Sequence, residues 1–200
     1  MKIPAALLLV VFLTGLLQAD LMKEIPKAQR GELTKGQTVI KSTEVEGVPW
    51  PQLCLFRIVN APPDVVSDLF IDYESASSYT PGLIQAQVLV THPDGSKDVR
   101  YTVKAPVIQR TSYVVRNTYR KQGDQFTVSW KLLQSPLAKQ SDGSLRIEPY
   151  EGDRTLLSYT NLCVPITNIV SGLKNQAVVE AKNTVLALAA EAERRANKLK

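Results

Sequence analysis

The chain has 200 residues, with 24 lysine and arginine against 19 aspartate and glutamate side chains, and a formal net charge of +5. This length favours one domain that is large enough to bury a core. The basic residues are scattered along the chain, which argues against a nucleic-acid-binding protein and favours a mildly basic, solvated surface. We therefore expect no nucleic-acid partner.

The first nineteen residues form a separate segment. Lys2 gives it a positive start, residues 5–17 are an apolar run, and Ala19 precedes Asp20. This pattern predicts a secretory signal peptide over residues 1–19. The alternative is a retained membrane anchor, although the run is shorter than the roughly 20 residues that a span needs. We expect an exported protein, periplasmic or secreted, whose membrane contact is at most transient.

The folded domain is expected over residues 37–200. Residues 20–36 before it are polar and basic and lack periodicity, so we expect a linker or a loosely docked arm. The expected elements that follow are strands over Gln37–Val45 and Leu53–Val59, then short helices over Asp64–Asp72 and Glu74–Tyr79.

A row of strands separated by turn residues comes next. Each strand alternates apolar and polar residues, as expected for a sheet with one buried face. We expect the Ser-Asp-Gly sequence that ends at Gly143 to form a turn before a looser strand. The expected strands are Ile84–Thr91, Asp98–Lys104, Ser112–Arg120, Gln125–Leu133, Ser144–Pro149 and Arg154–Val164.

The last stretch, from Pro165 to the C-terminus, has the one long helical pattern. Its apolar residues recur at steps of three and four, which predicts one buried helix face. Helices segregated to one side of an antiparallel sheet define an α+β fold. The predicted face comprises Ile166, Ile169, Val170, Leu173, Ala177, Ala181, Thr184, Val185 and Leu188.

Polar residues interrupt two of the apolar strand faces. These residues are asparagines, Asn117 and Asn161. If the faces are buried, each side-chain amide needs a hydrogen-bonding partner, which a ligand, the backbone or an ordered water can supply. Small residues in the middle of the helix either leave room for such a ligand or allow close helix–sheet packing. The candidate ligand-binding residues are Asn117, Tyr119, Trp130, Tyr159 and Asn161 on the strands, and Leu173, Ala177 and Ala181 on the helix.

The sequence is poor in catalytic groups. His92 is the single histidine, and its His-Pro-Asp-Gly turn favours a solvated position on the surface. The sequence contains no metal-site spacing and no phosphate-binding or dinucleotide-binding motif. We expect no catalytic residue, no metal ligand and no cofactor.

Several segments resemble the START-like or Bet v 1-like helix-grip superfamily, which includes lipid-transport proteins and polyketide cyclases. The resemblance extends from Thr38 to Glu193. It implies a curved antiparallel sheet of about six to eight strands round a long C-terminal helix, with two short helices after the first core strand. It also implies a hydrophobic tunnel between sheet and helix. The segments that carry it are Phe56–Tyr73, Ser78–Pro81, Ala86–Leu89, Asp153–Tyr159 and the helix after Pro165.

The same resemblance bears on the two cysteines, Cys54 and Cys163. In helix-grip folds the first core strand and the last strand are antiparallel neighbours. The two thiols could therefore form a cross-strand disulfide in an oxidising compartment. Two separate buried thiols are the alternative.

Three functions are compatible with the sequence. We prefer an exported protein that binds a hydrophobic small molecule, a lipid or isoprenoid, between the sheet and the C-terminal helix. The alternatives are a cyclase-like or hydrolase-like enzyme that uses the same cavity, and an envelope protein that binds a partner through its sheet surface. The sequence identifies neither the ligand nor the oligomeric state.

Overall fold

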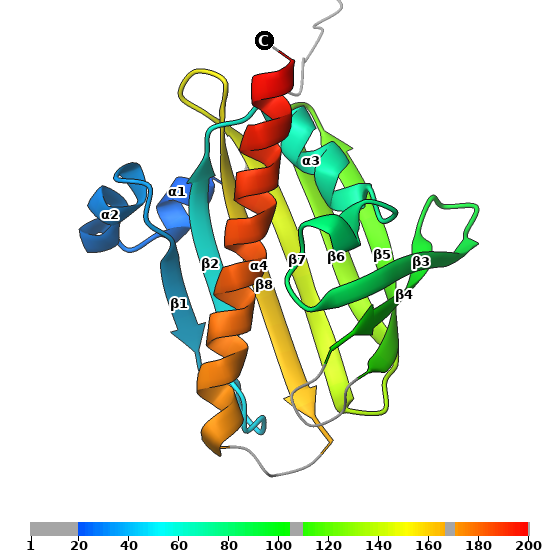
Figure 1. Cartoon of the computed structure of the whole chain (residues 1–200). Helices are drawn as coiled ribbons and strands as arrows, with labels where there is room; N and C mark the ends of the chain where they lie inside the picture. Colours follow the sequence, from blue (N-terminus) through cyan, green and yellow to red (C-terminus); the bar gives the residue numbers. More distant parts are fainter. Residues whose placement is uncertain (1–19, 105–109, 167–170, 200) are drawn as a thin grey trace, which may run out of the picture.

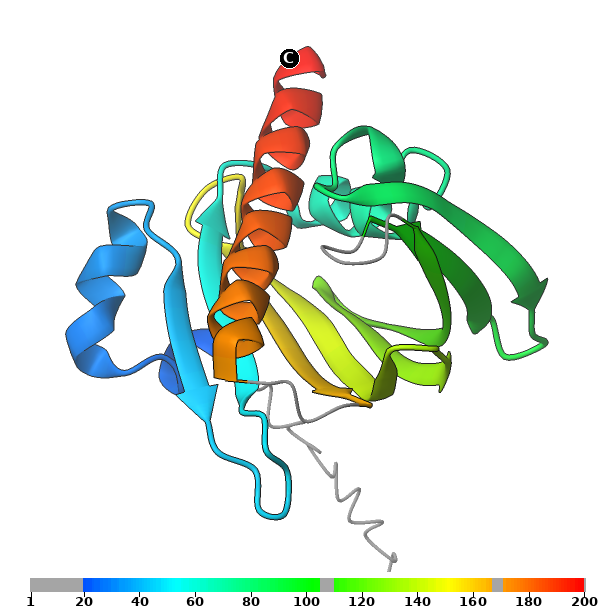
Figure 2. The same cartoon turned by 60° about the horizontal axis from the view of Figure 1, so that its bottom comes forward.

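The computed structural model describes residues 20–104, 110–166 and 171–199, with the backbone alone for residues 171–173. The predicted signal peptide lies outside the described residues. Eight antiparallel strands form a sheet in the order β1-β2-β8-β7-β6-β5-β4-β3, and Figures 1 and 2 show this sheet curving round α4. The predicted α+β helix-grip fold is confirmed. The elements are α1 (Leu21–Glu24), η1 (Lys27–Gln29), α2 (Arg30–Thr34), β1 (Val39–Thr43), β2 (Gln52–Val59), α3 (Pro63–Ile71), η2 (Ala76–Ser78), β3 (Leu83–Thr91), β4 (Lys97–Val103), β5 (Thr111–Gln122), β6 (Gln125–Gln134), β7 (Ala138–Tyr150), β8 (Arg154–Pro165) and α4 (Ser171–Lys198).

The main core lies between the concave face of the sheet and α4. Leu55, Leu145 and Leu157 come from β2, β7 and β8, and each is fully buried against the helix. Val185 and Leu188 supply the bulk from α4. The rest of the buried helix face consists of alanines, which allow α4 to contact β2 and α3. These alanines are Ala181, Ala189, Ala192 and Ala196.

The long helix begins later than we predicted. β8 extends to Pro165, which pairs with Ala138 at the end of the sheet. Ile166 is 43% exposed, and its N–H donates to the carbonyl of Leu137, so it does not belong to the helix face. The predicted face residues 169 and 170 lie outside the described residues. Among the helices that the structure describes, none is long and apolar enough to cross a membrane.

Residues 20–36 form a docked arm, which is one of the two alternatives that we expected, and not a linker. They fold into α1, η1 and α2 over the outer face of β2 and β8 (Figure 1). Leu21, Ile25 and Leu33 are each at most 1% exposed and pack against Phe56. Pro26 separates α1 from η1 and α2, so these residues never form a continuous helical period.

Polar contacts fix the start of this arm. The Asp20 carboxylate caps α1 by accepting from the N–H of Met22, and Glu148 on β7 accepts from the N–H of Leu21 at 2.9 Å. Burial raises the pKa of Glu148. Arg146 donates to Glu24 at 2.6 Å and ties the end of α1 to the same strand.

β7 runs through the turn that we predicted at its Ser-Asp-Gly sequence. Gly143 lies opposite Trp130 on β6 and Asn161 on β8. A Cβ atom on Gly143 would lie 2.6 Å from Cε2 of Trp130, and closer still to the carbonyl oxygen of Thr160. The glycine is therefore needed because the indole ring lies close to the backbone here, and the chain does not change direction at this position.

The predicted disulfide is wrong, because both cysteines are free. β2 and β8 are neighbours as the resemblance implied, but their register pairs Cys54 with Thr160. Cys163 lies three positions beyond Thr160, and an odd offset places it on the opposite face of the sheet. Cys54 instead accepts a hydrogen bond from the Thr160 hydroxyl at 3.3 Å.

Candidate ligand-binding site

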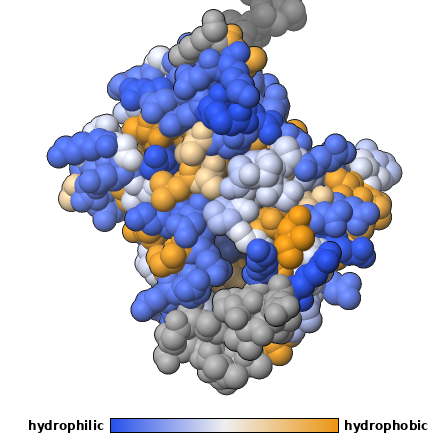
Figure 3. Space-filling view, viewed as in Figure 1, coloured by the Kyte–Doolittle hydropathy of each residue, from blue (hydrophilic) through white to orange (hydrophobic). Residues whose placement is uncertain are grey.

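A cavity of ≈ 160 Å³ lies between the concave face of the sheet, the segment from α3 to β3, and α4. Figure 3 shows the surface hollowed between α4 and the β3–β4 hairpin, with hydrophilic residues round the hollow. Aromatic side chains dominate the lining, and none of the lining residues that the structure describes is charged at neutral pH. They are Phe70, Tyr73, Ala76, Tyr79, Thr80, Pro81, Leu83, Tyr101, Val103, Tyr113, Val115, Asn117, Trp130, Ser141, Tyr159 and Thr184.

Three of the predicted residues line this cavity: Asn117, Trp130 and Tyr159. The strand register explains how they meet. Asn117, Trp130, Gly143 and Asn161 lie side by side in one row across β5, β6, β7 and β8. Because Gly143 has no side chain, the Trp130 ring can lie across β7 and contact Tyr159, with ring centroids 5.2 Å apart. The indole thus forms a continuous wall with the phenol of β8.

Two strand residues that we predicted do not line the cavity. The hydroxyl of Tyr119 is hydrogen-bonded to the hydroxyl of Tyr73, which does line it, so Tyr119 supports the wall from behind. Asn161 is at the end of the row, beyond Gly143. Its Oδ1 is buried and has no hydrogen-bonding partner in the described part of the chain.

Two of the three predicted helix residues lie elsewhere. Ala181 is 8% exposed and belongs to the core between sheet and helix, while Ala177 is half-buried outside the lining. The side chain of Leu173 lies outside the described residues. The contribution of α4 to the cavity comes from Thr184, one helical turn beyond Ala181.

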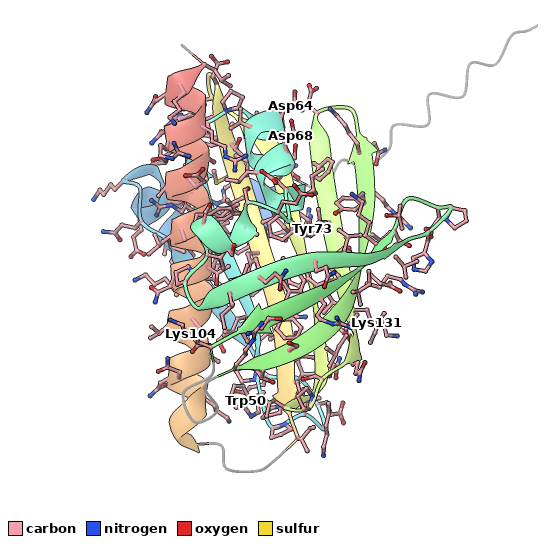
Figure 4. All side chains as sticks on the ribbon, turned by 45° about the vertical axis from the view of Figure 1, so that its right-hand side comes forward. Trp50, Asp64, Asp68, Tyr73, Lys104 and Lys131 are labelled. Atoms are coloured by element: carbon pink, nitrogen blue, oxygen red, sulfur yellow. The ribbon has the colours of Figure 1, made fainter. Side chains whose placement is uncertain are left out.

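Sequence reasoning missed part of the aromatic lining. Tyr101 on β4 lies directly opposite Tyr113 on β5, and their rings stack with centroids 5.5 Å apart. Tyr73, which is labelled in Figure 4, lies beyond the end of α3. Its ring meets that of Tyr101 edge-on, with centroids 6.3 Å apart. The alternation of Val99, Tyr101 and Val103 was a usable signal for Tyr101. No period marks Tyr73, because it lies between two helices.

The phenols of the lining are neutral at physiological pH. Burial raises the pKa of Tyr79 and of Tyr113 to about 12. Burial is also the main cause that raises the pKa values of Tyr73, Tyr101 and Tyr159. A buried phenolate would be an uncompensated charge in an apolar site, so each hydroxyl keeps its proton and can donate a hydrogen bond.

Asn117 is the most deeply buried polar side chain of the lining, with 2% of its surface exposed. Its Nδ2 atom has no hydrogen-bonding partner among the residues described. The amide lies beside Tyr101, where it partly opposes the rise that burial and Tyr113 cause in the pKa of Tyr101. This end of the cavity is therefore lined by neutral polar side chains, with the Asn117 amide nitrogen itself buried.

Ion pairs from α4 hold the segment after α3 over the cavity. Arg195 donates to Asp72 at 3.0 Å and to the Ser75 hydroxyl at 2.7 Å, and its Nε donates to Glu191 at 3.0 Å. Hydrogen bonding from Ser75, assisted by Arg195, lowers the pKa of Asp72. Nearby, the Tyr79 hydroxyl donates to a carbonyl oxygen of α3 at 3.2 Å. These contacts fix the part of the wall that includes Tyr73 and Tyr79.

The eight-stranded sheet curved round α4 and the cavity between them define a helix-grip fold with an internal cavity. No family model matches the sequence, and no curated protein matches it. Solved structures do match. A STAR-related lipid transfer protein from Xanthomonas axonopodis superposes with a TM-score of 0.66 and 23% identity, over 78% of this chain and 93% of that one.

Two further solved structures show the range of the fold. Human StAR-related lipid transfer protein 5 has a TM-score of 0.69 and 10% identity, over 80% of this chain and 83% of its own. The Zhui aromatase/cyclase from a Streptomyces strain has a TM-score of 0.62 and 21% identity, over 72% and 94% of the two chains. At these identities the likeness establishes the fold alone.

Proposed function

We propose that this protein binds a neutral hydrophobic small molecule, a lipid or isoprenoid, between the sheet and α4. The observation that carries the proposal is the cavity of ≈ 160 Å³ with its uncharged, largely aromatic lining. Apolar pockets with a few convergent polar groups are the usual sites for small molecules. The names of the Xanthomonas and human proteins, both lipid transfer proteins, support the same class of ligand.

The protonated phenols argue against a general base in the lining of the cavity. Tyr79 and Tyr113, with pKa values of about 12, donate hydrogen bonds at neutral pH but do not accept a proton from a substrate. The fold itself is compatible with chemistry, since the Streptomyces protein is named an aromatase/cyclase. The lining of this cavity favours retention of a ligand.

We further propose that the protein is exported, as the signal-like sequence of residues 1–19 predicts. The docked arm supports a boundary between a signal peptide over residues 1–19 and a folded domain after it. Leu21 is fully buried, so the folded domain starts directly after the predicted cleavage position. A mature protein that begins at Asp20 would keep the whole docked arm, and intact mass measurement after expression with the full sequence identifies that N-terminus.

The binding proposal is tested by native mass spectrometry and organic extraction of the purified protein. We expect a hydrophobic molecule to accompany the folded chain or to be acquired from a panel of lipids. Thr184→Phe should place a ring in the cavity and abolish binding. Asn183→Phe, at an exposed position next to it on α4, should leave binding unchanged. Persistent absence of any ligand, or equal behaviour of the two variants, would overturn the proposal.

A further inference from the structure

Three large apolar side chains are exposed at one end of the sheet, which lies at the bottom of Figure 1. Leu133 is 47% exposed near the end of β6, Leu137 is 38% exposed in the connection to β7, and Ile166 directly follows β8. The hydrogen bond from the N–H of Ile166 to the carbonyl of Leu137 joins the last two of these segments. We call residues 131–142 together with Ile166 the β6–β7 tip. A group of exposed apolar side chains of this kind marks a surface for interaction.

The β6–β7 tip has a defined shape. β6 and β7 pair with each other only as far as Gly143, so the two strands separate within the tip. The carboxylate of Asp142 spans the gap and accepts from the N–H of Leu132 at 3.3 Å. The Ser135 hydroxyl accepts from the N–H of Leu137 at 3.1 Å and fixes the turn between the strands. The apolar side chains are therefore presented to solvent by an ordered segment.

Exposed basic side chains accompany the apolar ones. Lys131 and Lys139 belong to the tip itself. Lys104 and Arg110 are exposed where β4 ends and β5 begins, and the antiparallel order places these strand ends at the same end of the sheet. The one acidic side chain of the tip, Asp142, is already hydrogen-bonded within it. The tip and the strand ends beside it therefore have an excess of positive charge.

The charge differs between the two ends of the molecule. Figure 4 shows Lys104 and Lys131 in the lower part of the view, whereas the two labelled aspartates of α3 lie at the top. The strand connections at the lower end include two exposed acidic residues, Glu44 and Glu46. Both belong to the β1–β2 connection, which β8 and β7 separate from β6 in the sheet. The basic charge is thus concentrated on the side that carries the exposed leucines.

Leucines accompanied by lysines suit the surface of an anionic membrane. Apolar side chains enter the boundary between headgroups and acyl chains, while lysine stems lie along it and their ammonium groups reach the phosphates. Each basic residue near such a surface strengthens binding. The cavity is close to this end, because Ser141 of the tip belongs to its lining. A lipid surface at the tip would therefore lie beside the proposed ligand site.

We propose that the β6–β7 tip docks reversibly on an anionic membrane surface, with Leu133, Leu137 and Ile166 at the acyl boundary and Lys131 and Lys139 on the phosphates. This interaction goes beyond the proposed binding of a small molecule and does not require that the cavity is occupied.

Co-sedimentation of the full folded protein with vesicles tests the proposal. Vesicles of phosphatidylcholine alone are compared with vesicles that also contain phosphatidylglycerol. We expect binding to the anionic vesicles and much weaker binding to the neutral ones. Raising the salt concentration from about 0.1 M to about 1 M shortens the Debye length from about 10 Å to about 3 Å, so it should weaken the binding to anionic vesicles.

Variants with matched controls locate the contact. Leu133→Ser and Leu137→Ser should each weaken binding to anionic vesicles about fivefold, since each removes a half-exposed apolar side chain. Val90→Ser, at a position on β3 that is 46% exposed, should leave binding unchanged. Lys131→Gln should also cost about fivefold, whereas Lys35→Gln, at an exposed position in the arm, should have no effect. Melting curves from circular dichroism confirm that each variant is folded.

Equal binding to neutral and anionic vesicles would overturn the proposal, and so would binding to neither. The same holds if folded Leu133→Ser and Leu137→Ser variants bind as tightly as Val90→Ser. If vesicles bind as expected but native mass spectrometry and extraction find no ligand, membrane docking stands and the proposed binding function fails. If a ligand is found but no vesicle binds, docking alone fails.

Discussion

Replacing Gly143 by alanine tests the packing that builds the cavity wall. The new Cβ atom would lie 2.6 Å from Cε2 of Trp130 and closer still to the carbonyl oxygen of Thr160, where ordinary contacts begin at 3.4 Å. The indole cannot retreat freely, because it packs against Tyr159. The carbonyl belongs to the backbone of β8, next to β7, so its displacement disturbs the strand pair.

The expected cost follows from this crowding. Overpacking of a well-packed core costs about 1–3 kcal/mol. Since one of the two crowded neighbours is backbone, we expect Gly143→Ala to lower the free energy of unfolding by about 2–3 kcal/mol. For a domain of this size, this corresponds to a melting temperature about 4–12 °C lower.

A matched glycine provides the control. Gly31 lies in α2, and a Cβ atom there would have no neighbour within 4 Å. Gly31→Ala should therefore be neutral or stabilise the protein by up to about 1 kcal/mol, because alanine restricts the unfolded chain. The same chemical change thus has opposite signs at the two positions.

Urea denaturation followed by circular dichroism measures both variants. Near-ultraviolet circular dichroism reports separately whether the indole of Trp130 has moved. Gly143→Ala should cost less in a Trp130→Leu background than in the unaltered protein, because the part of the loss that is due to the ring is then absent and only the part due to the carbonyl of Thr160 remains. The reasoning is refuted if Gly143→Ala is as stable as the unaltered protein.

Three other expectations concern acid stability, the thiols and the arm. The pairing of Glu191 with arginines on its own helix, Arg194 first, lowers its pKa to about 2. Its stabilising contribution is thus complete above the unfolded pKa, near 4.5, and is lost as the pH falls towards 2. Glu191→Gln should then cost on the order of 2 kcal/mol at about pH 6 and clearly less at about pH 3, and equal losses in urea denaturation at both pH values would exclude this reasoning. Alkylation of the denatured, unreduced protein should modify both cysteines in the intact mass, and an unmodified linked pair would contradict the register of β2 and β8. Leu21→Ala should cost about 2–5 kcal/mol, whereas the exposed Lys23→Ala stays within about 0.5 kcal/mol; similar small effects would show that the arm is not docked.

Most of the fold prediction rested on the regular spacing of apolar residues along the sequence. The strands after Ile84 and the long helix were predicted because burial on one face imposes a period of two or of three to four on the sequence. Asn117, Trp130 and Tyr159 were found by the same reasoning, since each lies in phase with apolar neighbours that face the helix. The cavity lining from Tyr73 to Pro81 has no such period, because it covers the cavity as an irregular segment.

The errors have identifiable physical causes. The arm could not be told from a linker, because α1 and α2 each bury a single side chain, which is too few to produce a pattern. Ser-Asp-Gly resembles a turn locally, and only the position of Trp130 on the neighbouring strand explains Gly143. The disulfide prediction rested on strand neighbours, whereas register decides which face a residue occupies. The pairing of Leu53 with Asn161 fixes that register and separates Cys54 from Cys163.

The strand order also determines when the protein can fold during synthesis. β2, near the start of the chain, completes its pairing only with β8, near its end, and the arm rests on residues of both strands. Neither the arm nor β2 can complete its native contacts before residues 154–165 have been made. Pairings of such long sequence separation form slowly. The sheet of an emerging chain therefore stays incomplete until β8 has been made, and the apolar residues that β8 and α4 cover stay unprotected until then.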